Sequence, residues 1–419
     1  MTAGPRVALI CETFQEINGV ALTARQLVEF AKRQERPLLA IHGGPRVARF
    51  VEGSVTRLEL PRGPVSFAIE SDLRYDLWLW RHAQEARRAL EEFRPDAIHV
   101  TSPGEFGQLG AYLAHALKIP LVASWHTNLH QFAARRLGGM LRFLPEACSN
   151  ACCGHAERLA LLALLRFYKL ARVTLAPTPE QVRWLEKETG RASFLMVRGV
   201  DTEKFSPAHR TVDDDTVRLG FVGRVTAEKS VRFLVDVEQA LLAAGHTKFS
   251  FLVVGEGGER GWLEKNLRHG VFTGVLRGEE LARAYANMDL FLFPSRTDTY
   301  GNVIQEAAAS GVAAIVTSEG GPKNLVVPGT TGFVAANEDE FIFRTLEMLG
   351  DMAKLRAMGK AARENMNGVS WDAAFEMTYA AYRYAVENGG EESPAMKTAR
   401  KPVLAARSLH GRKAGAASS

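Results

Sequence analysis

The sequence predicts an α/β protein with two domains, each built on a parallel sheet. Short apolar runs alternate with helical stretches in both halves of the 419-residue chain. Such alternation is typical of parallel sheets covered by helices on both faces. The length and the 46% content of hydrophobic residues suit two domains of ordinary size. A polar stretch at 206–216 interrupts the alternation and marks the boundary.

The expected strands and helices follow one another in order along both halves. Strands are expected at 7–10, 38–41, 97–100, 121–124, 173–176 and 194–197, and then at 219–222, 249–254, 271–273, 290–293, 313–317 and 332–334. Helical periodicity lies between the early strands at 21–33, 77–93 and 105–117. A last helix at 371–387 carries apolar and aromatic residues on one side.

The chain is expected to divide into four parts. A first domain, residues 1–210, precedes a second domain, residues 211–370. The helix within 371–388 would cross back to the first domain, and 389–419 would be a disordered basic tail. Six Lys and Arg follow Glu392, whereas the whole chain carries a net charge of +5. The folded part is therefore close to neutral, and the tail is a solvated extension or a weak contact for anionic lipid or nucleic acid.

Composition argues against several protein classes. No stretch approaches the roughly 20 apolar residues of a membrane-spanning helix. The apolar run at 7–10 is too short for the core of a signal peptide, and the charged Glu12 follows soon after it. Four cysteines do not make a disulfide framework. We therefore expect a cytoplasmic protein without a specific nucleic-acid partner.

The most informative segment follows the strand expected at 290–293. A polar loop holds Asp298 and Gly301, and a helix is expected to start near Val303 with Glu306 in its first turn. Helix N-termini hold anions, and ligands bind in crevices at the carboxyl ends of parallel strands. The segment therefore predicts a nucleotide-sugar site with two carboxylates beside it.

Two cations follow the first strand of the second domain. A glycine turn leads to Arg224, and Lys229 stands five residues later at the start of a helical pattern. A guanidinium can bind two phosphate oxygens, and lysine supplies a point charge. Two solvated surface cations after an ordinary turn are the alternative. The presence of Asp298 and Glu306 further along the chain favours a site for a diphosphate.

Taken together, these motifs resemble the retaining glycosyltransferases of family 4, also called group 1, which have the GT-B fold of two Rossmann-like domains. The resemblance covers the chain up to about residue 385 and rests on several motifs in the order of that family. They are Asn18-Gly-Val20, Ser124-Trp-His126, Phe221-Val-Gly-Arg224 with Lys229, Val254-Gly-Glu-Gly257, Phe272-Thr-Gly274 and the segment from Pro294 to Gly311. Within the family, Thr297-Asp-Thr-Tyr-Gly-Asn-Val303 is most similar to bacterial GDP-mannose-dependent α-mannosyltransferases and related lipid glycosyltransferases.

The resemblance implies a role for each residue of the donor site. Glu306 would bind the ribose hydroxyls of the nucleotide, and Asp298 would bind hydroxyls of the donor sugar. The alternative for Asp298 is a carboxylate that caps the helix, and the alternative for Glu306 is a glutamate favoured by the helix dipole. The backbone N–H groups around Gly301, Asn302 and Val303 would meet the diphosphate.

The same resemblance implies catalysis without a metal ion or a bound cofactor. Arg224 and Lys229 would neutralise the charge that grows on the leaving diphosphate. That diphosphate would take the proton of the acceptor in a front-face attack, so that the anomeric configuration is retained. An Asp-x-Asp pair, which would suit a catalytic metal, occurs only within the polar run at 213–215. The nucleoside-diphosphate sugar is then the donor substrate.

Two residues of the first domain complete the predicted site. Gly19, in the loop after the first strand, would let the backbone approach the donor phosphate, and a plain tight turn is the alternative. His126 follows the strand at 121–124, and by resemblance it would position the sugar rather than act as a base. An ordinary hydrogen-bonded histidine is the alternative. The first domain would bind the acceptor and the second the donor, and the cleft would close on binding.

The acceptor is expected to be a lipid or a glycan. Arg135 and Arg136 lie among apolar residues after His126, and the stretch 155–172 mixes four cations with many leucines. A helix with a solvated basic face is one interpretation. Peripheral contact with an anionic membrane, on the inner face of the cell membrane, is the other.

Three cysteines lie close together before this stretch. Cys148 and Cys152 are four residues apart on an expected helix, and Cys153 and His155 follow. No second group of Cys and His has the spacing of a zinc site. Small buried thiols are therefore expected rather than a metal centre.

Other functions remain open at this point. UDP-glucose or another UDP-sugar is the second choice of donor after GDP-mannose. A phosphorylase or a sucrose-type synthase would use the same charged residues with another leaving group. A nucleotide-binding scaffold would keep the fold without activity, but the intact set of charged residues argues against it.

Overall fold

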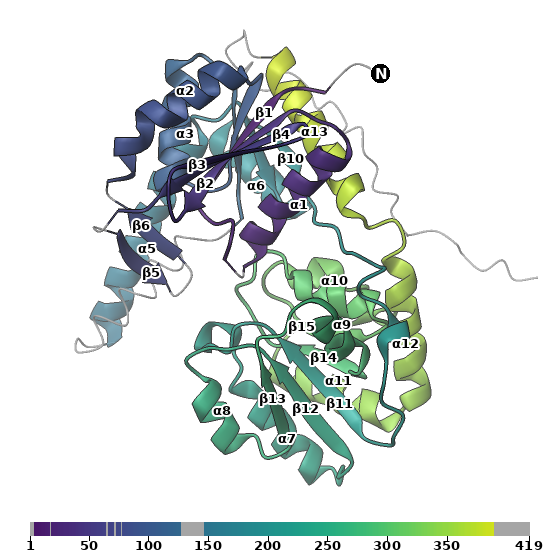
Figure 1. Ribbon diagram of the computed structural model, residues 1–419. Coiled ribbons are helices and arrows are strands. Elements are labelled where there is room, and N and C mark those ends of the chain that lie inside the picture. Colours follow the sequence, from purple (N-terminus) through teal and green to yellow (C-terminus); the bar gives the residue numbers. More distant parts are fainter. Residues whose placement is uncertain are drawn as a thin grey trace, which may run out of the picture.

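The protein forms two α/β domains, one above the other in Figure 1, each with one large sheet. The computed structural model describes residues 4–16, 18–63, 66–70, 73–76, 78–126 and 146–388. Parallel sheets with helices packed against them confirm the predicted fold class. The expected basic tail at 389–419, as well as Arg135 and Arg136, lie outside the described residues.

The first domain is built on an eight-stranded sheet in the order β10-β9-β8-β7-β1-β2-β4-β3. Only the edge strand β3 runs antiparallel to its neighbour. The strands are β1 (Val7–Cys11), β2 (Leu38–Gly44), β3 (Ala48–Glu52), β4 (Val55–Pro61), β7 (Ala97–Val100), β8 (Leu121–Ser124), β9 (Val173–Ala176) and β10 (Ala192–Leu195). A separate hairpin consists of β5 (Ser66–Glu70) and β6 (Leu73–Asp76). The central strands β1, β7, β8 and β9 are buried along their whole length, which explains their continuous apolar runs.

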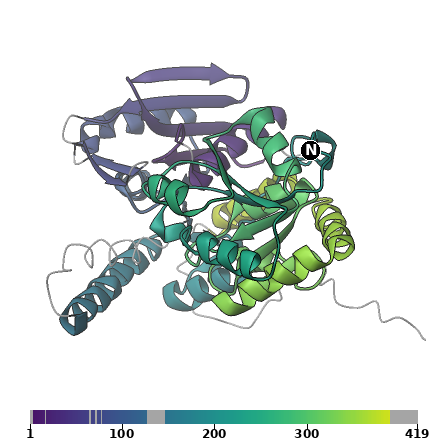
Figure 2. The same ribbon diagram turned by 90° about the horizontal axis from the view of Figure 1, so that it is seen from below.

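Two apolar cores stabilise this domain. In one core, α1 packs against the sheet together with the last helix of the chain, and in the other core α2 and α3 do so. The helices are α1 (Gly19–Arg33), α2 (Ala83–Phe93) after the 3₁₀ turn η1 (Leu79–His82), α3 (Glu105–Ala116), α5 (Glu146–Tyr168) and α6 (Pro179–Thr189). Figures 1 and 2 show α5 extending away from the body of the domain.

The second domain has a six-stranded parallel sheet in the order β13-β12-β11-β14-β15-β16. The strands are β11 (Val217–Val222), β12 (Phe249–Val254), β13 (Gly270–Gly274), β14 (Leu290–Phe293), β15 (Ala313–Thr317) and β16 (Gly332–Ala335). Counted from β11, this is the Rossmann order 3-2-1-4-5-6. Because the strand order reverses between β11 and β14, the crevice at their carboxyl ends is the expected ligand site.

One large apolar core holds the second domain together. The helices around it are α7 (Phe233–Ala243), α8 (Arg260–Asn266), α9 (Gly278–Ala286), α10 (Asn302–Ala309), α11 (Glu338–Gly350) and α12 (Met352–Asn365). Short 3₁₀ turns are η2 (Pro207–His209), η3 (Ala227–Lys229) and η4 (Pro322–Leu325).

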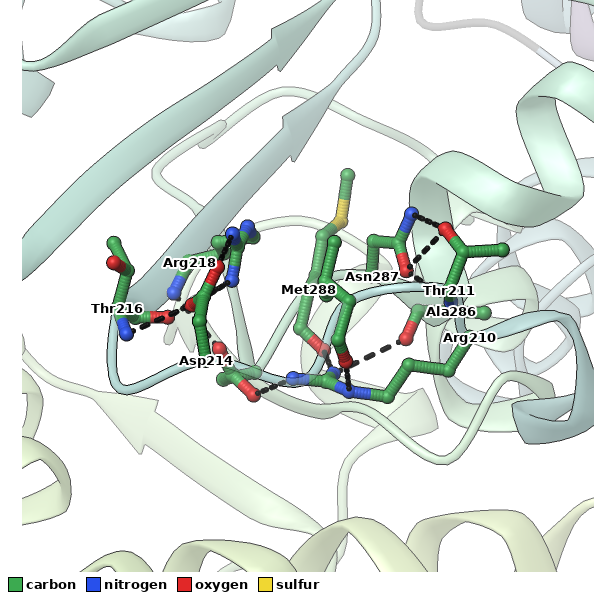
Figure 3. A network of polar contacts seen from close by, with 10 residues as sticks. Arg210, Thr211, Asp214, Thr216, Arg218, Ala286, Asn287 and Met288 are labelled. Atoms are coloured by element: carbon green, nitrogen blue, oxygen red, sulfur yellow. Dashed lines mark hydrogen bonds and ion pairs between the residues drawn. The ribbon is translucent and has the colours of Figure 1, made fainter.

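The linker between the two sheets is tied to the second domain by a polar network (Figure 3). Arg210 donates to the carbonyls of Ala286 and Met288, each at 3.2 Å. Asp214 accepts from the guanidinium of Arg218 at 2.9 and 2.6 Å. The acidic run at 213–215 therefore helps to fix the start of β11.

The last described helix, α13 (Trp371–Glu387, yellow in Figure 1), lies on the first domain beside α1 (purple). The ring of Phe375 lies 5.5 Å from that of Phe30. Arg36 forms an ion pair with Glu376 at 2.6 Å. The two domains are thus joined both by the linker and by the connection from α12 to α13.

Some local expectations were wrong. The stretch 77–93 is not one helix, because a 3₁₀ turn precedes α2, which begins at Ala83. The strand expected at 194–197 lies two residues earlier, at 192–195. The strands between 48 and 76 were not predicted; β3, for example, is an exposed edge strand with no apolar run.

Candidate functional site in the cleft between the domains

The carboxyl edges of the two sheets face a common cleft. It has a volume of about 1680 Å³ and is lined by both domains. Because ordinary ligand pockets measure about 300–1,000 Å³, this cleft has room for a nucleotide sugar and an acceptor together. All nine residues that the sequence analysis assigned to the site line this cleft. They are Gly19, His126, Arg224, Lys229, Asp298, Gly301, Asn302, Val303 and Glu306.

Four charged side chains form a cluster near the carboxyl ends of β11 and β14. Lys229 Nζ lies 2.6 Å from Asp298 Oδ1 and 3.6 Å from Glu228 Oε1. Arg224 Nη2 lies 3.2 Å from Glu228 Oε2. Each cation therefore has a carboxylate partner. Glu228 was not among the residues predicted from the sequence, although its position directly before Lys229 was a usable signal.

Asp298 has one carboxylate oxygen in an ion pair and one without a partner. Oδ1 accepts from Lys229, whereas Oδ2 is buried and accepts no hydrogen bond from any described residue. A buried acceptor without a donor costs about 1–3 kcal/mol.

Helix α10 begins four residues after Asp298, beside this cluster. Its N-cap is Gly301, whose φ of +93° is favourable for glycine and strained for other residues. The helix therefore begins at Asn302, and Glu306 lies in its second turn. The expectation that Glu306 lies in the first turn was wrong. The first N–H groups of a helix have no intrahelical partners and favour anions.

Glu306 is held by a tyrosine of the neighbouring helix. Tyr285, fully buried on α9, donates its hydroxyl hydrogen to Glu306 Oε2 at 2.7 Å. Burial raises the pKa of Glu306, and the hydrogen bond from Tyr285 opposes that shift. The contact fixes the direction of the carboxylate toward the cleft. Tyr285 carries no motif, so the sequence offered no signal for its role.

His126 is part of a buried chain of hydrogen bonds in the first domain. Its Nε2 lies 2.8 Å from Ser124 Oγ, and Ser124 Oγ lies 2.9 Å from His99 Nε2. On the other side, Arg198 Nη2 lies 3.4 Å from His126 Nδ1. Burial, followed by the charge of Arg198, holds the pKa of His126 well below its usual value. The ring is therefore neutral, with Nδ1 as acceptor and Nε2 as donor, and both nitrogens are engaged.

Gly19 is the first residue of α1 rather than a loop residue. Asn18 precedes it, and its Oδ1 accepts from the N–H groups of Val20 and Ala21 at 3.1 and 2.8 Å. A Cβ on Gly19 would lie 2.7 Å from Arg198 Nη1. The glycine thus permits the close approach of Arg198, a residue that the sequence analysis did not identify.

A second pair of carboxylates lies in the wall of the first domain. Glu12 follows β1 directly, and Glu105 is the first residue of α3; both are buried. Arg62 Nε lies 3.8 Å from Glu105 Oε1. Glu12 Oε1 and Glu105 Oε1 have no hydrogen-bond partner among the described residues. Burial, and then the charge of Glu105, raise the pKa of Glu12 to about 8.

This pair predicts that stability falls as the pH rises toward 8. Because the pKa of Glu12 is higher in the folded than in the unfolded chain, the contribution of its proton to stability is fully present below about pH 4.5. This contribution is lost as the pH rises from there to about 8, while the unfolded chain ionises and the folded chain keeps the proton. One such proton changes the free energy of unfolding by about 1.4 kcal/mol per pH unit. Urea unfolding at pH 5.5 and 8 should show a smaller difference in Glu12→Gln than in the wild type. Glu279→Gln, at an exposed position, is the control, and an unchanged difference in Glu12→Gln would contradict the assignment.

The cysteines do not form the buried group that was expected. Cys152 is exposed and Cys153 is partly exposed, because both lie on the projecting helix α5. The side chain of Cys148 lies outside the described residues. Among the residues that the structure describes, no cluster of three or more His, Cys, Asp or Glu is arranged to hold a metal ion.

The projecting helix α5 carries apolar and basic side chains on its surface. Leu159 and Leu162 are 63% and 49% exposed, and Arg158 and Arg166 are exposed on the same helix. Among the described helices, none has the length and hydropathy of a membrane-spanning segment.

Comparison with known proteins identifies the family of the chain. A profile described as glycosyltransferase family 4 matches residues 17–204, and one described as glycosyl transferases group 1 matches residues 216–351. The chain is 30% identical over 392 residues to the GDP-mannose-dependent alpha-mannosyltransferase of Mycobacterium tuberculosis, covering 88% of this chain and 93% of that protein. It is 29% identical over 382 residues to the enzyme of the same name from Corynebacterium glutamicum, covering 88% and 86%.

The solved structures agree on the fold. Sucrose-phosphate synthase from Thermosynechococcus elongatus matches with a TM-score of 0.68 and 18% identity, covering 90% of this chain and 98% of that one. Two domains of this kind, a cleft lined by paired cations and carboxylates, and sequence relatives over most of the length lead to one conclusion. The chain belongs to the family 4 (group 1) glycosyltransferases of GT-B fold and is a hexosyltransferase that acts on nucleotide sugars.

Proposed function

We propose that the protein transfers mannose from GDP-mannose to a lipid or glycan acceptor, with retention of the anomeric configuration and without a metal ion. The observation that carries this proposal is the cluster of Arg224, Lys229 and Asp298 beside the start of α10. The choice of GDP-mannose is supported by the names of the two bacterial relatives, which are 29% and 30% identical to this chain.

The donor would lie across the second sheet at the point where its strand order reverses. Glu306, oriented by Tyr285, would accept hydrogen bonds from the ribose hydroxyls. Asp298 Oδ2, buried and without a partner among the described residues, would accept from a hydroxyl of the sugar. The diphosphate would meet Arg224, Lys229 and the N-terminus of α10.

The chemical step then depends on the leaving group. The bond from the anomeric carbon to the phosphate oxygen breaks, and the acceptor oxygen bonds to the same face of that carbon. The acceptor proton passes to the departing phosphate. Arg224 and Lys229 would stabilise the negative charge there, which is the main requirement of such a transition state. His126 would position the donor sugar and not act as a base, since both of its ring nitrogens are engaged in hydrogen bonds.

The acceptor side would lie in the first domain. Exposed leucines beside arginines on α5 support a peripheral contact with an anionic membrane, where a lipid acceptor would be found. This contact would place the enzyme on the inner face of the cell membrane.

The proposal is tested by the release of nucleoside diphosphate from a panel of donors, namely GDP-mannose, UDP-glucose and UDP-galactose. Lipid extract is presented as acceptor in neutral and in anionic vesicles, with and without EDTA. We expect release from GDP-mannose that EDTA does not abolish, that is faster with anionic vesicles, and that is lost in Glu306→Ala.

Each part of this experiment has an outcome that would contradict one part of the proposal. Release from a UDP-sugar alone would replace the donor, and sensitivity to EDTA would contradict metal independence. Equal rates with both kinds of vesicle would contradict the membrane contact. No release and no nucleotide binding by calorimetry would favour an inactive scaffold.

A further inference from the structure

Arg198 is a buried guanidinium that lines the cleft without an ion-pair partner. It follows β10 in the segment between the domains, and only 5% of its surface is exposed. No carboxylate among the described residues lies within ion-pair distance of it, and its Nε has no hydrogen-bond partner there. Burial lowers its pKa to about 10, so it stays charged at neutral pH. Buried charges in proteins are normally paired.

The surroundings hold this side chain in one place through neutral groups. Tyr300 OH accepts from the backbone N–H of Arg198 and donates to its carbonyl, both at 3.2 Å. The guanidinium lies 5.3 Å from the centre of the Tyr300 ring. Nη1 donates to Asn302 Oδ1 at 3.0 Å, and Nη2 lies 3.4 Å from His126 Nδ1. These contacts fix the fork of the guanidinium but bring no negative charge to it.

The position of the guanidinium points to an anion. It lies between Gly19, the first residue of α1, and Asn302, the first residue of α10, two helices on opposite sides of the domain boundary in Figure 1. Each of these helix ends favours a negative group. Asp298 is the carboxylate that acts on Arg198 through space, and it is already paired with Lys229.

We propose that Arg198 binds the diphosphate of the donor as a third cation, in addition to Arg224 and Lys229. The inference rests on the proposed function, since it requires a nucleoside-diphosphate sugar in the cleft. A guanidinium can donate two parallel hydrogen bonds to phosphate oxygens. Because Arg198 belongs to the linker and contacts both domains, the bound diphosphate would also hold the domains together.

The test separates charge from mechanical support. Isothermal titration calorimetry gives the Kd of GDP, UDP, guanosine and uridine for the wild type, Arg198→Gln and Arg198→Lys. Glutamine is neutral but keeps an N–H donor toward Asn302. We expect Arg198→Gln to raise the Kd of the nucleoside diphosphate that the wild type binds by about tenfold or more. The Kd of the matching nucleoside should stay unchanged. Arg198→Lys should lose less, since it keeps the charge without the fork.

Arg296→Gln is the matched control, because Arg296 pairs with Glu319 and Glu338 on the surface of the same domain. Equal losses for diphosphate and nucleoside would show a purely structural role and overturn the inference, as would an unchanged affinity for the diphosphate. If Arg198→Gln does not fold, as judged by its thermal unfolding, the same comparison with Arg198→Lys decides. A wild type that binds neither diphosphate would refute the proposed function as well, whereas binding that is unaffected in the variants refutes this inference alone.

Discussion

Lys229→Met is expected to lower kcat/KM for the donor by a factor of about 10²–10³, the usual loss for one stabilising group of a transition state. Lys229 is 7% exposed and lies 2.6 Å from Asp298, so its charge is fixed in the cleft before the donor binds. The variant would lose the cation that meets the leaving diphosphate. It would also leave Asp298 and Glu228 close together without the lysine between them. Initial rates of diphosphate release measure the effect.

A structural contribution of Lys229 can be separated from a catalytic one. Lys229→Met combined with Asp298→Asn removes the uncompensated charge of Asp298 and should restore the melting temperature without restoring turnover. Lys354→Met, which breaks an exposed pair with Glu347, should change neither quantity. If Lys229→Met retained kcat/KM within threefold of the wild type, the lysine would not stabilise the leaving group.

Glu306→Ala is expected to abolish the preference of the protein for a nucleotide with ribose hydroxyls over one that lacks them. Hydrogen bonds to a charged group contribute about 1.5–3 kcal/mol, so the wild type should prefer GDP over its 2′,3′-dideoxy analogue by about ten- to a hundredfold. In the variant this preference should fall to about one, because alanine accepts no hydrogen bond. The ratio of the two Kd values, measured by calorimetry, is the readout; if UDP is the nucleotide bound, the uridine pair replaces the guanosine pair.

Tyr285→Phe tests how the carboxylate is oriented. Removal of the hydroxyl that donates to Glu306 Oε2 at 2.7 Å should reduce the preference for ribose only partly. Glu338→Ala, at a surface pair with Arg296, should leave it unchanged. A preference for ribose that survives in Glu306→Ala would assign the ribose contact to another residue.

Much of the donor site could be predicted from the sequence because its residues follow strands of a parallel sheet. Arg224 comes after β11 and Asp298 after β14, and the carboxyl ends of parallel strands meet at one edge. A local pattern therefore located both residues in the same crevice. The predicted start of α10, near Val303, was one residue late. It could be predicted because Gly301 supports a turn that few other residues allow.

Charge pairing within the site could not be predicted in this way. Glu228, four residues from Arg224, was overlooked because an acidic residue beside a lysine has many ordinary explanations. The pair of Lys229 and Asp298, 69 residues apart, forms only in the fold. Glu12 and Glu105 are far apart in the chain, and their shared environment exists only once α3 packs beside the end of β1. The strand β3 was missed because an exposed edge carries no apolar run.

The sequence alone determined the fold class, the family and the main charged residues, because hydrophobic periodicity and motifs after strands are local properties of the chain. Tertiary structure decided which groups touch across the cleft. Arg198 is 104 residues from Asn302 and 72 from His126, and no local pattern connects them. Their contact requires both domains and the segment between them to be folded, since burial is a property of the packed molecule and not of any one segment.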